Sequence, residues 1–382
     1  MERPAMTRAV AYLDHNATTP LSDAARAAMA AAWAEGPLNP SSKHYPGQRA
    51  RAIIEEARES VADRLGAAAD EVIFTSGGTE AANLAVRGAP VERFIVSFME
   101  HPAVMKPAKA SGRPVALWEV DERGVADLAA LKRHLAAGSG RALVCLMLAS
   151  NETGVIEPLA EAAAIAHEHG ALVFCDAVQA AGKMDVDMRA LGVDMLAVSA
   201  HKFGGPQGAG VLIVREGIAL EPLLLGGGQE RRLRAGTENV AAIAGLAAAL
   251  DEALRNRAEK DSHVRRLRDR LESALQAVAP DAVIFSSGAE RLSNTVMFAH
   301  PALEADVALM AFDLDGVALS AGSACHAGRG EVSRALVAMG ADRELARRAL
   351  RVSLGPGNTE EDIARFAASL RNQLRRAHAS AA

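Results

Sequence analysis

ALVFCDAVQ, residues 171–179, and MLAVSAHKFGG, residues 195–205, decide the fold of this chain. Each begins as a short, nearly continuous apolar run and ends in polar residues, which is typical of a strand buried on both faces of a parallel sheet. Similar runs alternate with helical patterns from about Glu71 to Arg215, and this alternation predicts βαβ units. We therefore expect a mainly parallel sheet between helices, with ligand-binding groups at the carboxyl ends of its strands.

Hydrophobic runs predict the remaining elements. The first part of the chain has seven expected strands, at Val72–Thr75, Phe94–Phe98, Val115–Val120, Ala142–Ala149, Ala171–Cys175, Met195–Ser199 and Gly210–Val214. A charged, Ala/Leu-rich stretch from Glu238 to about Ala279 predicts one long helix leading out of this part. Beyond it we expect strands at Ala282–Ser286, Thr295–Phe298, Val317–Ser320 and Leu350–Leu354, with helices near Glu331–Met339 and Thr359–Ala377. The fold class is therefore α/β, with a large domain, a smaller C-terminal domain and a cleft between them.

Composition limits the classes of function. Half of the 382 residues are apolar, and the formal net charge is -5 without a long block of one sign. The chain shows no basic footprint for nucleic acid, so a small molecule or another protein is the expected partner. Neither a signal peptide nor an apolar run of roughly 20 residues is found, so a cytoplasmic location without membrane contact is expected. Cys145, Cys175 and Cys325 are too few for a disulfide framework and have no C-x-x-C spacing, so we expect reduced thiols and no zinc.

FTSGGTE, residues 74–80, ends an expected strand, turns on two glycines and opens a helix. Free backbone N–H groups and the helix dipole attract an anion at such a turn, which indicates a phosphate site. Taken alone, an ordinary strand-to-helix turn capped by Thr79 explains the segment equally well.

Two further polar groups follow later strands. Asp176 stands where a carboxylate can pair with a protonated ring nitrogen, although a helix N-cap is the commoner role of such an aspartate. Lys202 precedes a glycine-rich loop; a lysine there can lose its proton and form a Schiff base, whereas an isolated lysine is usually a solvated surface charge. An anion cup, a ring-nitrogen partner and an imine-forming lysine together predict pyridoxal 5'-phosphate (PLP).

Further motifs resemble the cysteine desulfurases of the NifS/IscS type, within the class-V aminotransferase family. The resemblance runs nearly end to end and rests on LDHNATTP (13–20), NPSS (39–42), EH (100–101), NETG (151–154), RAGT (234–237), SAC (323–325) and RVSLG (351–355). It implies the PLP-dependent transferase fold type I. It also implies an N-terminal segment 1–15 packed with the small domain, a PLP-binding domain over 16–260, and a small domain over 261–382 carrying the cysteine loop.

The resemblance implies a role for each matching residue. The phosphate would be bound by Gly78, Thr79, Ser199 and His201, and Thr237 would reach the cofactor of a partner subunit, which implies a homodimer. Around the ring it implies His101 for stacking and proton transfer, Asp176 for the ring nitrogen, Asn151 and Gln179 for the ring oxygen, and Lys202 for covalent attachment. Substrate would be bound by Asn39, Asn151 and Arg351, the last through a bidentate contact with the carboxylate. Seen singly, His101, Asn151 and Arg351 are more often a core histidine, a turn residue and an ion-pair partner, but their joint match favours the site.

Cys325 is the expected sulfur-accepting residue. It stands among Gly322, Ser323 and Gly328, a loop composition, whereas Cys145 and Cys175 lie in apolar strands and are expected only to pack. The resemblance implies conversion of L-cysteine to L-alanine, catalysed by Lys202, His101 and Cys325, with a persulfide left on Cys325. It implies transfer of that sulfur to acceptors such as iron–sulfur cluster assembly proteins. No metal site is expected, apart from transient ligation of a cluster by Cys325 during transfer.

Three alternatives stay open at this point: a selenocysteine lyase, another class-V aminotransferase, and a non-catalytic assembly scaffold. The sequence also departs from the family. FGGPQ (203–207) follows Lys202 in place of the usual Ile-Tyr-Gly-Pro-Lys, and His326 follows the cysteine. These departures remove no expected catalytic group, but they leave the acceptor protein and the preference for selenocysteine open.

Overall fold

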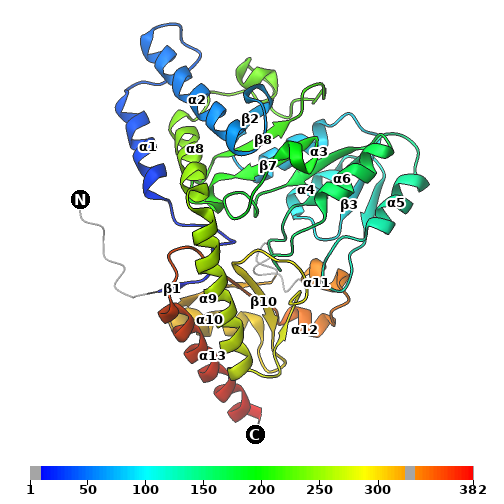
Figure 1. Cartoon of the computed structure of the whole chain (residues 1–382), viewed down its shortest axis with the longest axis vertical. Coiled ribbons are helices and arrows are strands. Elements are labelled where there is room, and N and C mark those ends of the chain that lie inside the picture. The colour runs from blue at the N-terminus through cyan, green and yellow to red at the C-terminus, as the bar shows by residue number, and fades with distance from the viewer. Residues whose placement is uncertain (1–9, 323–331, 382) are drawn as a thin grey trace.

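The computed structural model describes residues 10–322 and 332–381, and its larger sheet has seven strands. These are β2 (Val72–Thr75), β3 (Arg93–Ser97), β4 (Val115–Trp118), β5 (Ala142–Met147), β6 (Leu172–Asp176), β7 (Met195–Ser199) and β8 (Gly210–Val214). In the order β2-β8-β7-β6-β5-β3-β4, only β8 runs antiparallel to its neighbours. The predicted mainly parallel sheet is therefore confirmed (Figure 1).

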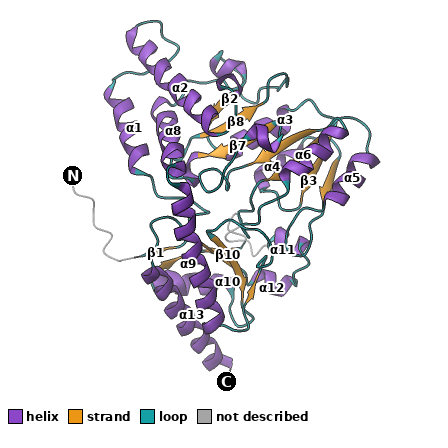
Figure 2. Ribbon diagram, in the orientation of Figure 1, coloured by secondary structure: helices purple, strands orange, loops and turns teal. Residues whose placement is uncertain are grey.

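Helices cover both faces of this sheet (Figure 2). Along β5, Val144 and Leu146 belong to the core with α2 (Tyr45–Arg64), α5 (Leu128–Ala137), α6 (Leu159–Glu168) and α8 (Val240–Leu254). Leu143 and Cys145, which point the other way, pack with α3 (Gly78–Gly88) and α4 (Pro102–Ala110). Helix α1 (Asp23–Ala34) packs on α8, and the short α7 (Met188–Leu191) precedes β7. Burial on both faces explains why these strands read as continuous apolar runs.

The second sheet is smaller and antiparallel, with its strands in the order β12-β13-β10-β9. Its strands are β9 (Val283–Ile284), β10 (Thr295–Ala299), β12 (Ser320–Ala321) and β13 (Leu350–Ser353). It shares a core with α9 (Arg257–Val278), α10 (Ala305–Leu314) and α13 (Glu360–Ala381), while α11 (Arg334–Ala338) and α12 (Arg343–Arg347) pack toward the large sheet. Strand β1 (Ala11–Tyr12) pairs in parallel with β11 (Val317–Ala318), and Ala11 together with the following Leu13 belongs to the same core. The strand expected over Val317–Ser320 is thus divided between two sheets.

The prediction of one long helix over Glu238–Ala279 is wrong. Helix α8 ends at Leu254, Arg255 is extended, and Asn256 adopts a left-handed φ of 52° before α9 begins. The two helices serve different cores: α8 packs on the large sheet, whereas Val264, Leu267, Leu271 and Leu275 of α9 face the small one. Asparagine tolerates the left-handed conformation, so the break needs neither glycine nor proline. The boundaries 1–15, 16–260 and 261–382 stay a prediction.

None of the helices within residues 10–322 and 332–381 combines the length and apolar character needed to cross a membrane.

Candidate functional site

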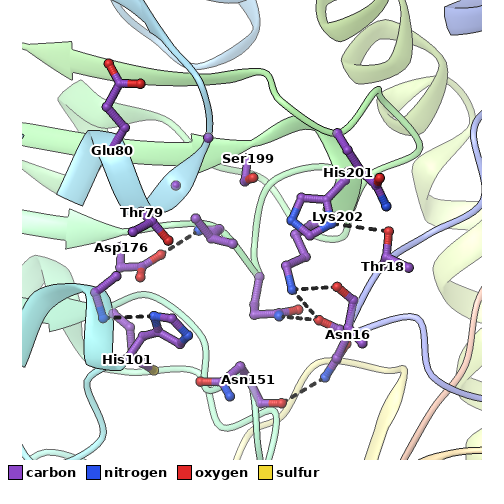
Figure 3. A pocket seen from close by; sticks show the side chains of 18 of the residues that line it. Asn16, Thr18, Thr79, Glu80, His101, Asn151, Asp176, Ser199, His201 and Lys202 are labelled. Carbon is purple, nitrogen blue, oxygen red and sulfur yellow. Dashed lines mark hydrogen bonds between the residues drawn. The ribbon is translucent and has the colours of Figure 1, made fainter. Parts of the chain in front are cut away.

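A cavity of about 650 Å³ lies at the carboxyl ends of the large-sheet strands, with Arg351 of β13 on its opposite side. It brings together most of the predicted site residues, namely Gly78, Thr79, His101, Asn151, Asp176, Gln179, Ser199, His201, Lys202 and Arg351. Figure 3 shows His101, Asn151, Asp176 and Lys202 around the same space. Other lining residues, among them Asn16, Thr18, Gln207 and Gly208, had no role predicted from the sequence.

The N-terminus of α3 forms one wall of the cavity. Gly77 caps it with a φ of 150°, a value that favours glycine, and a Cβ on Gly78 would lie 2.8 Å from Cγ2 of Val178. Ser76 N donates to Oε2 of Glu80 at 2.8 Å, which fixes the first turn. The first N–H groups of a helix have no intrahelical acceptor, so this turn suits an anion.

Lys202 ends the short helix η2 (Ala200–Lys202), which follows β7. Its Nζ donates to the backbone oxygens of Asn16 at 2.6 Å and Ala17 at 2.9 Å. The backbone of the N-terminal segment therefore supplies the hydrogen-bond acceptors of the lysine amino group (Figure 3).

Asn16 is almost fully buried and joins the two sheets. Its Nδ2 donates to Thr295 Oγ1 at 2.9 Å and to Asn151 O at 3.2 Å, and its backbone N donates to Ser353 Oγ at 2.9 Å. Asn294 Nδ2 donates to its Oδ1 at 3.0 Å. The only sequence signal for a role of Asn16 was its place in the 13–20 motif. Its backbone oxygen accepts the hydrogen bond from Lys202, and residue type does not predict a backbone contact.

Asp176 lies at the end of β6, where its Oδ1 accepts a hydrogen bond from Val178 N at 3.0 Å. Burial raises the pKa of its carboxyl to about 6, against the lowering effects of the Val178 N–H and of Lys202. A buried carboxylate needs a cationic or hydrogen-bonding partner. A protonated ring nitrogen in the cavity would supply one.

Two histidines of the site are held in defined states. His101 is the N-cap of α4, and its Nδ1 accepts from Ala103 N at 3.1 Å, so a neutral ring carries its hydrogen on Nε2. Burial, with Lys202 and Lys183 nearby, lowers the pKa of His201 to about 4. His201 is therefore neutral at pH 7, with Nδ1 3.2 Å from Thr18 Oγ1.

Arg351 is buried at the small-sheet side of the cavity. Its NH2 group pairs with Asp14 Oδ1 at 2.8 Å, and its NH1 group donates to Asn151 O at 3.0 Å. Its Nε–H has no acceptor among the described residues. The guanidinium is thus fixed in place while its Nε–H remains unused.

Of the predicted site residues that the structure describes, two do not line this cavity. Asn39 is exposed and its Oδ1 accepts from Ser41 N at 3.0 Å, and Thr237 is also exposed. Cys325, with its neighbours Ser323 and His326, lies outside the described residues. Cys145 and Cys175 are fully buried free thiols, and burial raises the pKa of both well above the ordinary value.

The loop that leads to Thr237 is held by a buried ion pair. Glu230, Arg231 and Arg232 have positive φ values of 41°, 54° and 68°. Arg58 of α2 binds both carboxylate oxygens of Glu230, at 2.8 and 2.9 Å, and Phe74 N donates to the same carboxylate at 2.8 Å. The side chains of Arg58 and Glu230 are only 5% and 1% exposed.

These residues fit PLP as a group. The turn at α3 suits its phosphate, the buried Asp176 carboxylate suits its ring nitrogen, and Lys202 extends to the same cavity.

Comparison with known proteins places this arrangement in a family. Residues 11–366 match the family model for aminotransferase class-V. The chain is 42% identical over 370 residues to an IscS-like cysteine desulfurase of Mycobacterium tuberculosis, covering 93% of each. It is 39% identical over 361 residues to the cysteine desulfurase IscS of Dictyoglomus turgidum, covering 92% of this chain and 91% of that protein. The solved NifS-like protein from Rickettsia africae superposes with a TM-score of 0.89 at 32% identity, covering 96% of this chain and 100% of that chain.

Proposed function

This chain belongs to the class-V aminotransferase family and is a cysteine desulfurase, and from that premise we propose how its residues take sulfur from L-cysteine. The observation that carries the proposal is the convergence of the α3 turn, Asp176, His101, Lys202 and Arg351 on one cavity. The first four come from the carboxyl edge of the large sheet, and Arg351 comes from the small sheet.

PLP is the proposed cofactor. When bound, it supplies a ring that accepts the electron pair left on the substrate carbon. The backbone of Gly78 and Thr79, with Ser199 and the neutral His201, would hold its phosphate. Asp176 would hold its ring nitrogen, Asn151 and Gln179 its ring oxygen, and Lys202 would attach it covalently.

Proton transfer is the proposed task of Lys202 and His101. The Asn16 and Ala17 carbonyls, which accept hydrogen bonds from Lys202 Nζ at 2.6 and 2.9 Å, would hold the released amino group beside the substrate carbon. His101 presents the edge that carries Nε2, because its Nδ1 is occupied by the Ala103 N–H. Each group can take up or return a proton at a fixed position.

Arg351 is the proposed carboxylate ligand. Its guanidinium is already oriented by Asp14 and Asn151 O, and its Nε–H still lacks an acceptor among the described residues. A substrate carboxylate would satisfy that donor. Asn39 is a second proposed substrate contact. It is exposed and does not line the cavity of its own chain, so it would reach substrate in the cavity of a partner subunit or after a rearrangement.

Cys325 is the proposed sulfur acceptor. Its thiolate sulfur attacks the sulfur of the bound cysteine, an S–S bond forms, and the Cβ–S bond of the substrate breaks. The electron pair stays with the carbon fragment, which takes up a proton and leaves as L-alanine, so no external oxidant is needed. Cys145 and Cys175 are excluded from this role because both are buried inside the large sheet with raised thiol pKa values.

A homodimer is proposed from the surface next to the Thr237 loop. Leu224 and Leu225 are 43% and 83% exposed, and Ala235 N donates to Leu224 O at 3.2 Å within the same loop system. Large apolar side chains exposed beside a loop that would reach another active site favour a second copy as their cover. Thr237 would then contact the phosphate of the partner's cofactor.

The acceptor of the sulfur is proposed to be a thiol of an iron–sulfur assembly protein, and the cytoplasm is the proposed location. One experiment tests the desulfurase reaction itself. Purified protein is incubated with L-cysteine, and L-alanine is quantified together with the sulfide released by a reductant. Equal amounts of both, with one added sulfur atom on the peptide containing Cys325, are expected. A keto acid in place of alanine would indicate an aminotransferase. Activity with selenocysteine alone would indicate a selenocysteine lyase, and protein without cofactor would indicate a scaffold.

A further inference from the structure

Lys183 contacts two residues of the cavity from behind. Its Nζ donates to Gln179 Oε1 at 2.7 Å and to Asn16 Oδ1 at 3.2 Å. Lys183 is not among the residues that line the large cavity, but it lines a separate one of about 220 Å³ on the other side. Its amino group therefore lies between the two cavities, bonded to residues that line the larger one.

The hydrogen bonds around Gln179 fix the orientation of its amide. Asn16 O can only accept, so the amide must present Nε2 to it and Oε1 to the amino group of Lys183, whichever charge that group carries. Gln179 Nε2 donates to Asn16 O at 2.9 Å, the same oxygen that receives Lys202 Nζ at 2.6 Å. One N–H of the Gln179 amide is left for the cavity. Lys183, Gln179, Asn16 and Lys202 thus form one continuous network.

The surroundings of Lys183 are unusual for a lysine. Part of the residue reaches solvent, but its amino group is enclosed, and no ion pair within residues 10–322 and 332–381 includes it. The charged or titratable groups that interact with it are Lys202, Arg351, His15 and His201, and none of them is an anion. Burial, followed by Lys202 and Arg351, lowers the pKa of Lys183 well below its usual value. The cost of enclosing this amino group is offset by its two acceptors, Gln179 Oε1 and Asn16 Oδ1, so these hydrogen bonds account for its place.

We propose that Lys183 is a positioning residue for the desulfurase reaction: it holds the Gln179 amide with its N–H toward the cavity and steadies Asn16 under Lys202. This rests on the proposed function, because it assigns the N–H to the ring oxygen of the cofactor. Gln179 and Lys183 are four residues apart across a helical turn, in which Lys183 N and Met184 N both donate to Ala180 O. That spacing brings the two side chains together.

The test is a double-mutant cycle on the cofactor-loaded protein. Lys183→Met removes the donor and keeps the apolar stem, and Lys132→Met, at an exposed position of α5, is the matched control. For Lys183→Met we expect kcat/KM to fall about tenfold and the pH midpoint of the visible cofactor band to shift by about 0.5 to 1 unit, the range for one lost hydrogen bond. Lys132→Met should change neither quantity.

The decisive arm uses Gln179→Ala as the background. If Lys183 acts through Gln179, adding Lys183→Met there should cost less than about twofold in kcat/KM and leave the band midpoint unchanged. Equal losses in both backgrounds, or an unshifted midpoint in the single variant, would overturn the proposal.

A further variant covers loss of the fold. Should Lys183→Met fail to hold the cofactor, Lys183→Arg, which retains N–H donors, should keep the wild-type midpoint, and a shifted midpoint would contradict the assignment. The cycle presupposes wild-type protein that shows the cofactor band and releases alanine. Absence of either would count against the proposed function and not against the role of Lys183.

Discussion

Replacing Arg351 with methionine removes the guanidinium and keeps most of the apolar stem. A bidentate contact with a substrate carboxylate contributes about 2 to 4 kcal/mol, which corresponds to roughly 30- to 1000-fold in kcat/KM. In this structure Asp14 already occupies the NH2 group at 2.8 Å and Asn151 O the NH1 group at 3.0 Å. Because the substrate carboxylate must compete with Asp14 for the guanidinium, we expect the lower end, roughly 30-fold.

The Asp14→Asn variant distinguishes two possible roles of Arg351, binding the substrate carboxylate and a purely structural contact. It removes the anion that competes for the guanidinium and keeps an acceptor for Ser320 Oγ, which donates to Asp14 Oδ2 at 2.6 Å. If Arg351 binds substrate, this change should leave kcat/KM unchanged or raise it. If Arg351 only braces β13 against the N-terminal segment, both variants should lower it.

Initial rates of alanine release over a range of cysteine concentrations measure these effects. The visible cofactor band and the thermal midpoint are recorded for each variant, so that a folding defect is recognised. A value of kcat/KM for Arg351→Met within about threefold of wild type, less than a single hydrogen bond contributes, would refute the reasoning.

Three other predictions concern the cofactor, the nucleophile and pH. Lys202→Ala should lose the visible absorption of the attached cofactor, and an unchanged spectrum would remove Lys202 from its role. Cys325→Ala should keep that absorption while alanine release falls by several orders of magnitude, whereas Cys145→Ala should keep turnover and lose about 1 to 2 kcal/mol of stability in the packed sheet. Since Asp176 has its pKa raised from 3.8 to about 6, its contribution to the stability of cofactor-free protein is present at low pH and is lost as the pH rises through about 6. In urea unfolding, the free energy of unfolding of Asp176→Asn should fall less with rising pH than that of the wild type. Parallel pH profiles for the two proteins would contradict this prediction.

Hydrophobic runs predicted the large sheet well because its strands are buried on both faces by helices. Cys145 and Cys175 illustrate this: they fall on opposite faces, and each is enclosed by a different core. The polar residues that follow these runs were correctly expected at one edge, since parallel strands all end there. The α3 turn, Asp176 and Lys202 therefore follow from local sequence.

Other features depend on contacts that local sequence does not express. Asn16 acts partly through its backbone oxygen, and Lys183 resembles an ordinary surface lysine until its neighbours are placed around it. The break at Asn256 arises because α8 and α9 serve different cores, although both have helical composition. Two-residue strands such as β11 and β12 are too short for a periodic pattern to divide them correctly.

The Arg58–Glu230 pair fixes the shape of the loop over residues 230–237, which would contact a second copy in the proposed homodimer. Three successive residues in the left-handed region are unfavourable by about 1 to 3 kcal/mol each and persist only where the surroundings enforce them. Here the enforcing groups are Arg58 of α2 and the backbone of Phe74 in β2. The shape of the loop that leads to Thr237 is therefore determined when the large sheet folds. This loop is therefore preorganised within a single chain. If the proposed homodimer forms, two preformed surfaces would dock with little conformational entropy lost on contact, and subunit exchange should not require refolding of the loop.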